Sequence, residues 1–429
     1  MDLLIRNATI VPMTGEQPPV IGDIAIQGGK IVACGPSKTE VESDQVIDAT
    51  GMIAMPGLVN AHTHLSMTFF RNYQDTVSDL HDWLSKIWPL EDRLTRQDVL
   101  VGSRLALAEA IMSGTTCVAD MYFFADSTCQ AVLEAGIKAN IGLTLFGGID
   151  DTLKRCAENL EALEQAASCS NGLIHIDVAP HAVYTCTPET YRHAVHVAKE
   201  HGFGLHSHAS ETAVEVSRCR ASYGKTPIAH LHSLGFLGRS TYLAHCVHPQ
   251  DDDMAILADT GTVVVHNPSS NCKLASGVAP VTKLRTAGIP VALGTDGAAS
   301  NNTLDMFREM RLAAMLASVQ NGNPMAIPPY GILRMATVEG ARALGRTDEC
   351  GTLEVGKDAD ILLVDTRKAH LTPLNDPYSA LVFAIASSDV DTTICKGNIL
   401  MKNRILRSID LQQVVDDAGR NWNRLTDCP

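Results

Sequence analysis

Eight strand-like segments alternate with helical patterns through the middle of this 429-residue chain. The segments are residues 58–61, 116–120, 139–145, 174–179, 204–208, 241–244, 262–266 and 290–294. Between them lie helical patterns; Thr95 and Asp98, for example, resemble a capping box that opens a helix ending at Gly114. Eight strands, each followed by helical sequence, predict a (β/α)₈ barrel of the TIM type rather than an open sheet. No Gly-rich phosphate motif follows any of these strands, which disfavours a dinucleotide-binding fold.

Short β-rich segments occupy both ends of the chain and are broken by Gly, Asn and Pro. They are residues 3–5, 8–11, 24–27, 30–34 and 53–56 at one end, and residues 360–365, 390–395 and 399–402 near the other. We therefore predict two domains. Residues 1–56 and 353–429 form a discontinuous β-sandwich, and residues 57–352 form the barrel.

Charge and composition limit the partners of the chain. The formal net charge is −14, which argues against binding a nucleic-acid backbone. The 12 cysteines include no CxxC pair, which favours reduced thiols in a cytosolic protein. The first residues lack the apolar run of a signal peptide, and no segment approaches the length of a membrane span. We expect a cytoplasmic protein with no membrane partner.

Two His-x-His pairs lie where predicted strands end. His62 and His64 follow the first strand, and residues i and i+2 of a strand share a face, so both imidazoles can bind one divalent ion. Alone, this pair is weak evidence for a metal site, because a chance pair of unrelated polar residues is about as probable as a metal-binding pair. His206 and His208 repeat the pattern at the fifth strand. We choose His208 as the ligand because barrel active sites lie at the carboxyl ends of the strands, and we expect His206 to be a hydrogen-bonded histidine lower in the barrel.

An acid follows the eighth strand directly. Asp296 is a turn or helix-capping residue in the simplest interpretation, but buried carboxylates are costly unless they are paired or bind a metal. With His62, His64 and His208 it predicts a site of three imidazoles and one carboxylate. Such a site suits zinc, iron or nickel and leaves a position for water. The fourth strand ends at His181 with no lysine to bridge a second ion, so we expect one divalent metal, zinc in the first instance.

Three more polar groups lie at successive strand ends. Glu211, three residues after His208, can carry a proton, although a carboxylate at a helix start is the structural alternative. His245 follows the sixth strand and can stabilise a developing oxyanion; His248 is the weaker candidate. His181 can contact a substrate. For each group alone, a structural role is as plausible as a catalytic one.

The order of these motifs resembles the amidohydrolase superfamily, and within it the 5-methylthioadenosine/S-adenosylhomocysteine deaminases, over nearly the whole chain. The resemblance rests on Pro56-Gly57-Leu58-Val59-Asn60-Ala61-His62-Thr63-His64, Trp88-Pro89-Leu90-Glu91, His206-Ser207-His208-Ala209-Ser210-Glu211-Thr212, Ala244-His245-Cys246, His266-Asn267-Pro268-Ser269-Ser270-Asn271 and Gly294-Thr295-Asp296-Gly297. It implies His62, His64, His208 and Asp296 as metal ligands. It also implies Glu91, His181 and Glu211 as substrate contacts, with Glu91, in a loop, on the ribose hydroxyls.

The activity that the resemblance implies is hydrolytic removal of the adenine 6-amino group. Glu211 would protonate N1 of the purine, His245 would stabilise the new oxygen, and Asp296 would move the proton of the attacking water to ammonia. The family's arginines for an amino-acid carboxylate have no match in residues 142–148, although Arg155 lies further on. We therefore favour a neutral 5' group, as in 5'-methylthioadenosine, 5'-deoxyadenosine or adenosine, over S-adenosylhomocysteine.

Two alternatives remain open at this point. The chain can be a guanine, aminopyrimidine or triazine hydrolase of the same superfamily, but a ribose-binding acid such as Glu91 then has no role. A barrel scaffold without catalysis is disfavoured because all four ligands are present. The sequence leaves the oligomeric state open, and we expect that homo-oligomers can form through exposed helices or loops.

Overall fold

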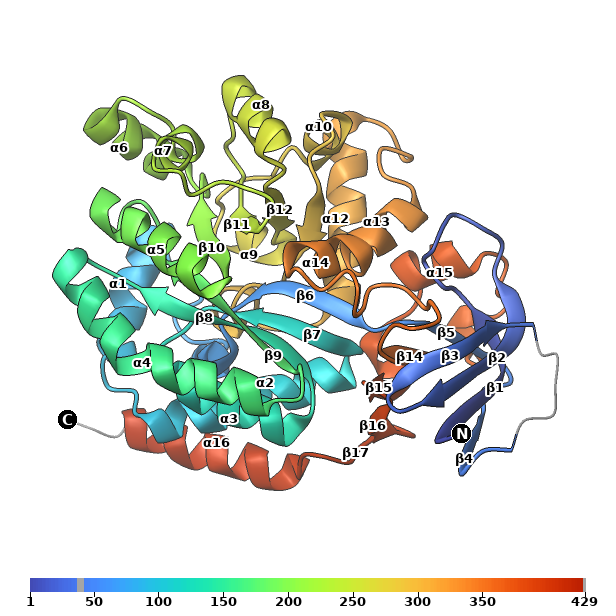
Figure 1. Ribbon diagram of the computed structural model, residues 1–429. Helices are drawn as coiled ribbons and strands as arrows, with labels where there is room; N and C mark the ends of the chain where they lie inside the picture. The colour runs from blue at the N-terminus through green and yellow to red at the C-terminus, as the bar shows by residue number, and fades with distance from the viewer. Residues whose placement is uncertain (37–41, 427–429) are drawn as a thin grey trace.

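Eight parallel strands form a barrel at the centre of the computed structural model, which describes residues 1–36 and 42–426 (Figure 1). In chain order they are β6 (Leu58–Thr63), β7 (Thr115–Asp120), β8 (Lys138–Leu145), β9 (Ile174–Pro180), β10 (Gly204–Ala209), β11 (Thr241–His245), β12 (Val263–His266) and β13 (Val291–Leu293). Each pairs in parallel with its neighbour in the chain. The backbone N–H of Asp296 donates to the carbonyl of His62 at 3.0 Å and joins the last strand to the first. The predicted barrel is confirmed, and every strand boundary lies within two residues of its expected place.

Helices follow the strands and cover the outside of the barrel (Figure 1). They are α1 (Leu80–Glu91), α2 (Arg96–Met112), α3 (Ala125–Ala135), α4 (Ile149–Cys169), α5 (Pro188–His201), α6 (Ala213–Tyr223), α7 (Pro227–Ser233), α8 (Asp251–Thr260), α9 (Pro268–Lys273), α10 (Val281–Thr286), α11 (Ala298–Asn301), α12 (Met306–Asn321), α13 (Pro329–Met335) and α14 (Val338–Ala343). The capping box predicted at Thr95 is present, because its side chain accepts from the backbone of Asp98 and the Asp98 carboxylate accepts in return. Gly202 ends α5 with φ of 72°, a conformation that favours glycine.

The two ends of the chain meet in a second, mixed sheet. It contains β1 (Leu3–Ile10), β2 (Val20–Gln27), β3 (Lys30–Gly35), β4 (Gln45–Asp48), β5 (Met52–Pro56), β14 (Ile361–Asp365), β15 (Val390–Cys395), β16 (Asn398–Lys402) and β17 (Ile405–Leu406). Strand β5 pairs with β14, which joins the N-terminal and C-terminal strands into one hydrogen-bonded sheet. The expected small β domain built from both ends is confirmed. The two segments predicted at residues 3–5 and 8–11 are in fact one strand, β1, interrupted by an irregularity at Asn7, where φ is 59°.

A buried ion network connects this sheet to the barrel. Lys138 begins β8 and is fully buried, and its Nζ lies 2.6 Å from Asp360 Oδ2 and 2.8 Å from Asp358 Oδ2. Both acids lie immediately before β14. A buried charge is tolerated only when it is paired, so this network fixes the start of β8 against the β domain.

The C-terminal helix α16 (Leu411–Thr426) lies along the barrel beside α2 (Figure 1). The Trp422 ring meets the edge of Phe70 at a centroid distance of 6.4 Å, and Phe70 follows β6. The helix packs on the barrel, although its residues belong to the range predicted for the β domain. The domain limits stay a prediction. Residues 427–429, at the end of that range, lie outside the described residues.

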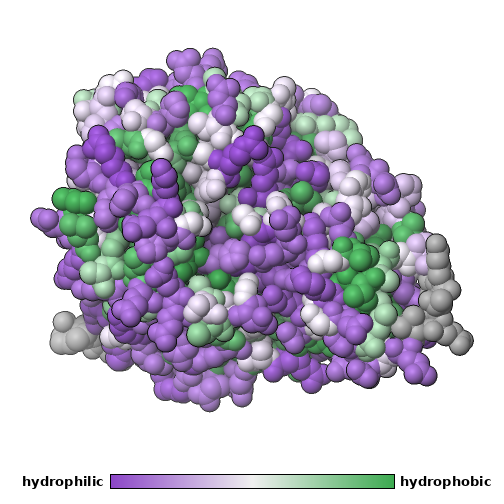
Figure 2. All heavy atoms as spheres, in the orientation of Figure 1, coloured by the Kyte–Doolittle hydropathy of each residue, from purple (hydrophilic) through white to green (hydrophobic). Residues whose placement is uncertain are grey.

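The visible face of the molecule is largely hydrophilic, with apolar side chains in scattered groups (Figure 2). Of the helices in the described ranges, none combines the length and apolar character that a membrane crossing requires. All eleven cysteines in residues 1–36 and 42–426 carry free thiols; Cys428 lies outside that part of the chain.

Candidate active site

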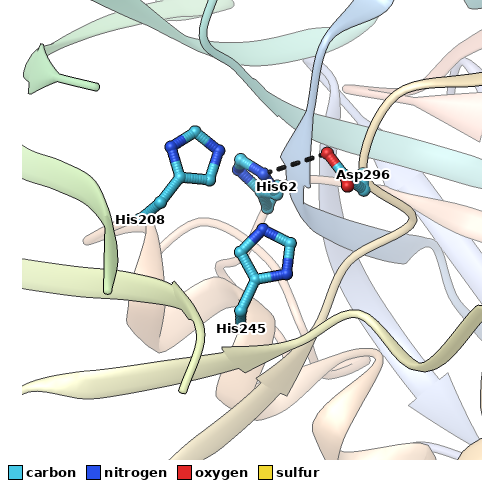
Figure 3. Close-up of side chains that lie close together, drawn as sticks. All are labelled: His62, His208, His245 and Asp296. Atoms are coloured by element: carbon cyan, nitrogen blue, oxygen red, sulfur yellow. Dashed lines mark ion pairs between the residues drawn. The ribbon is translucent and has the colours of Figure 1, made fainter. Parts of the chain in front are cut away.

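The four predicted ligands meet at the carboxyl ends of the barrel strands. Figure 3 shows three of them, His62, His208 and Asp296, together with His245. Asp296, just after β13, places its Oδ1 atom 3.3 Å from His62 Nε2 and 3.2 Å from His64 Nε2. His208 Nε2, from β10, lies 3.4 Å from His64 Nε2. Residues separated by up to 234 positions in the chain thus direct their ligand atoms at one point, as parallel strands with a common carboxyl end allow.

Hydrogen bonds orient two of these imidazoles for metal binding. His64 Nδ1 donates to the carbonyl of Met121 at 2.6 Å, and His208 Nδ1 donates to the carbonyl of His181 at 2.8 Å. The proton on Nδ1 leaves a lone pair on Nε2, which faces the site. Burial lowers the pKa of His208 well below its usual range, so this ring is neutral, as a metal ligand must be.

The third imidazole has an unpaired atom that a cation would satisfy. His62 Nε2 is buried and has no hydrogen-bond partner among the described residues. His62 Nδ1 lies 3.0 Å from His206 Nε2, so His206, expected lower in the barrel, supports a predicted ligand from below. Burial lowers the pKa of His62. An orphaned Nε2 beside a carboxylate and two aligned imidazoles fits a divalent metal ion.

Asp296 is fixed by two hydroxyls. Its Oδ2 atom accepts from Ser270 Oγ at 2.6 Å and from Ser300 Oγ at 2.9 Å, which leaves Oδ1 facing the imidazoles. Burial opposes ionisation, but the neighbouring imidazoles of His62 and His64 hold the pKa of Asp296 well below its usual range. The residue has φ of 62°, a strained conformation of the kind that concentrates at functional sites.

His245 ends β11 and faces the same point (Figure 3). Ligand atoms of His62, His208, His245 and Asp296 all lie within 4.8 Å of one another, so distance alone admits His245 as a ligand beside the predicted four. Its Nδ1 atom lies 2.9 Å from Asn271 Nδ2 and 3.4 Å from Asn267 Nδ2. His248 points elsewhere, because its Nε2 donates to the carbonyl of Ser276 at 2.6 Å.

Glu211 is a buried acid beside this cluster, and its surroundings favour the protonated form. Its Oε2 atom lies 3.8 Å from His245 Nε2, and Ser276 Oγ donates to its Oε1 at 3.4 Å. Burial, and then the negative charge of Asp296, raise the pKa of Glu211 well above its usual range. Glu215 holds the turn, because its carboxylate accepts from the backbone N–H of Glu211 at 2.7 Å. A buried, protonated carboxyl at this place can donate a proton to a bound molecule.

A pocket of about 610 Å³, its open mouth included, leads from the cluster to the surface. Helix α1 forms one wall with Leu80, Trp83, Leu84, Trp88 and Glu91. The prediction that Glu91 lies in a loop is wrong, because the helix continues through Pro89 and ends at Glu91. Tyr122 donates its hydroxyl to Glu91 Oε1 at 2.5 Å and fixes the acid in the pocket wall.

Another part of the pocket wall is aromatic. The rings of Phe123 and Phe146 stack at 5.3 Å, and Phe146 stacks on His181 at 4.6 Å. His181 lines the pocket, as predicted for a substrate contact, and its Nδ1 lies 2.9 Å from Thr185 Oγ1. Arg155, in α4, directs its guanidinium at the rings of Phe123 and Phe146, at 5.6 and 5.7 Å. The wall thus presents flat apolar surface, with a cation against the same two rings.

Comparison with known proteins identifies the family. The Amidohydrolase family model matches residues 53–400. The chain belongs to the amidohydrolase family. Within this family, a 5-methylthioadenosine/S-adenosylhomocysteine deaminase of Moorella thermoacetica is 47% identical over 428 residues, covering 98% of this chain and 99% of the relative. A 5'-deoxyadenosine deaminase of Methanosarcina mazei is 43% identical and covers 98% and 97%. The crystal structure of an adenosine deaminase from Xanthomonas campestris with bound zinc aligns with a TM-score of 0.95 and 34% identity, covering 100% and 99%.

Several residues of this amidohydrolase site were not singled out from the sequence. Tyr122 lies two residues after Asp120, the last residue of β7, and the period of a strand could have marked it. Ser270, Asn267 and Asn271 lie in a segment that the family resemblance includes, but no local pattern assigns them a partner. Trp83 lines the pocket through α1, whose position over the barrel depends on tertiary packing.

Proposed function

We propose that this amidohydrolase removes the 6-amino group of adenine in a nucleoside with a small neutral 5' group, such as 5'-methylthioadenosine, and releases ammonia. The observation that carries the proposal is the meeting of three imidazoles and the Asp296 carboxylate in one pocket that the buried Glu211 also lines. The names of the relatives support the same reaction class.

We propose His62, His64, His208 and Asp296 as the ligands of one zinc ion. The donor set of three imidazoles and one carboxylate suits zinc, and the structural neighbour from Xanthomonas campestris contains zinc. Zinc held there would activate water for attack at neutral pH by lowering the pKa of that water from about 15.7 towards 7.

The side chains around the ion divide the proton transfers. Glu211 carries the proton that N1 of the purine needs as oxygen adds to C6, because its raised pKa favours the protonated form. The lowered pKa of Asp296 favours its ionised form, so it would take the proton of the attacking water and return it to the leaving ammonia. His245 donates a hydrogen bond to the oxygen that forms on C6.

The two pocket walls support a nucleoside substrate. Glu91 supplies a carboxylate oxygen for the ribose hydroxyls, and its hydrogen bond from Tyr122 holds it in place. His181 presents its ring to the base from the other wall. The apolar surface of Phe123 and Phe146 suits an uncharged 5' substituent such as a methylthio group.

The other amidohydrolase substrates weighed above, guanine, aminopyrimidines and triazines, are bare rings. Glu91 argues against them, because in the part of the chain that the structure describes only its Oε1 atom has a hydrogen-bond partner, Tyr122, and a bare ring offers no ribose hydroxyl to the other carboxylate oxygen. We expect turnover of methylthioadenosine to exceed that of a chlorotriazine, and Glu91→Ala to raise KM for the nucleoside. A faster reaction with the chlorotriazine would reverse the assignment.

The direct test measures ammonia release from methylthioadenosine by the zinc-loaded protein. Glu211→Gln should retain zinc, measured by metal analysis, and lower kcat about a hundred- to ten-thousand-fold. Glu200→Gln, on exposed α5, is the matched control and should behave as the parent. A Glu211→Gln protein that keeps full turnover would remove Glu211 from the proton path.

A further inference from the structure

The short helix α9 and the residue before it hold two of the groups assigned to catalysis. Ser270 Oγ donates to Asp296, as described above. Asn271, the next residue, and Asn267, which precedes the helix, direct their side-chain amides at His245. The segment from His266 to Asn271 was part of the family resemblance, but nothing so far gives its asparagines a role.

The amides determine which nitrogen of His245 carries the proton. Asn271 Nδ2 lies 2.9 Å from His245 Nδ1, and Asn267 Nδ2 lies 3.4 Å from the same atom. Both asparagines are buried, with 1% and 0% of their surfaces exposed. An amide nitrogen can only donate, so His245 Nδ1 must accept, and the proton of the neutral ring lies on Nε2.

This arrangement is the opposite of that of two neighbouring imidazoles. His64 and His208 donate from Nδ1 to backbone carbonyls, and their unprotonated Nε2 atoms face the cluster. His245 turns a protonated Nε2 to the same point, 3.8 Å from Glu211 Oε2. A protonated nitrogen cannot bind a metal, but it can donate to an oxygen.

We propose that Asn271, assisted by Asn267, is a positioning residue that holds His245 in the Nε2–H tautomer. The asparagine pair thereby excludes His245 from the metal, although His245 lies within ligand distance, and makes it a hydrogen-bond donor to the oxygen at the reacting carbon. The inference rests on the deamination proposed above and adds the residue that determines the role of His245.

The tautomer can be measured without substrate. We would label the histidines with ¹⁵N and record two-bond ¹H–¹⁵N correlations of the zinc-loaded and the chelated protein. The signals of His245 are those missing from the spectrum of the variant His245→Gln, which retains Glu211. The expected result is an unprotonated Nδ1 and a protonated Nε2 at His245, with the reverse at His208. A proton on Nδ1 of His245 in the parent protein would overturn the proposal.

Asn271→Asp tests the consequence with almost no change of shape. A carboxylate accepts where the amide donates, so we expect the proton to move to Nδ1 and kcat to fall about a hundredfold, as when one oxyanion donor is lost, with KM little changed. Ser270→Ala, on the same helix, should leave the His245 tautomer as in the parent. Unchanged kcat with a reversed tautomer would overturn the proposed role. A parent with the expected tautomer but no deaminase activity would instead contradict the proposed function alone.

Discussion

Gly294 lies where the last barrel strand meets the first, and it has no room for a side chain. A Cβ atom there would lie 2.6 Å from Asn267 Oδ1 and 2.9 Å from both the Cβ and the backbone N of His62. Ordinary contacts begin at 3.4 Å, so these atoms would have to move by about 0.5 to 0.8 Å. The φ of Gly294 is not positive, so an alanine would be strained by its surroundings rather than by its backbone.

We therefore expect Gly294→Ala to act on the metal site as well as on stability. Inserting one methyl group at this contact between β13 and β6 should lower the free energy of unfolding by about 1–3 kcal/mol. Because the displaced atoms belong to the proposed ligand His62 and to the support of His245, zinc affinity should fall about ten- to a hundredfold. Urea unfolding measures the first effect, and competition with a chromogenic chelator measures the second.

Gly419→Ala is the matched control. Gly419 lies on the exposed side of α16, and no described heavy atom lies within 4 Å of the position a Cβ would take. Alanine favours a helix over glycine by about 1 kcal/mol, so this variant should be as stable as the parent or slightly more so. If Gly294→Ala bound zinc like the parent and unfolded at the same urea concentration, the contact between β13 and β6 would not determine the position of His62.

Three further predictions concern stability, pH and specificity. Lys138→Met should lower the free energy of unfolding in urea by about 3–5 kcal/mol, because it leaves Asp360 buried without its cation and removes one of the three lysines that pair with Asp358. Burial raises the pKa of Glu309 from 4.5 to about 7, so between these pH values the folded chain holds a proton that the unfolded chain releases. The free energy of unfolding should therefore fall by up to about 3 kcal/mol as pH rises from about 4.5 to 7. Glu309→Gln should not show this loss when urea unfolding is measured at both pH values. Phe146→Arg should raise the ratio of kcat/KM for S-adenosylhomocysteine to that for methylthioadenosine about tenfold, because the new guanidinium would pair with the amino-acid carboxylate of S-adenosylhomocysteine. An unchanged ratio would mean that the 5' group does not bind beside residue 146.

The sequence alone determined the barrel and the residues at its metal-binding end. Strands buried on both faces have short, continuously apolar sequences, and the residue that follows each of these segments lies at the carboxyl edge of the sheet. His62, His64, His208 and Asp296 could be grouped for this reason before any coordinates were known. Likewise, β-rich segments at both ends predicted a second domain, although the interruption at Asn7 made one strand look like two.

Tertiary structure alone decided how those groups are oriented. The hydrogen bond from Asn271 to His245 spans 26 residues, and that from Tyr122 to Glu91 spans 31. No periodic pattern records such a pair, because its geometry follows from how separate strands and helices pack. The place of α16 against the barrel has the same cause. Local sequence specifies which atoms arrive at the site, whereas packing specifies which of them carries the proton and which is free to bind a cation.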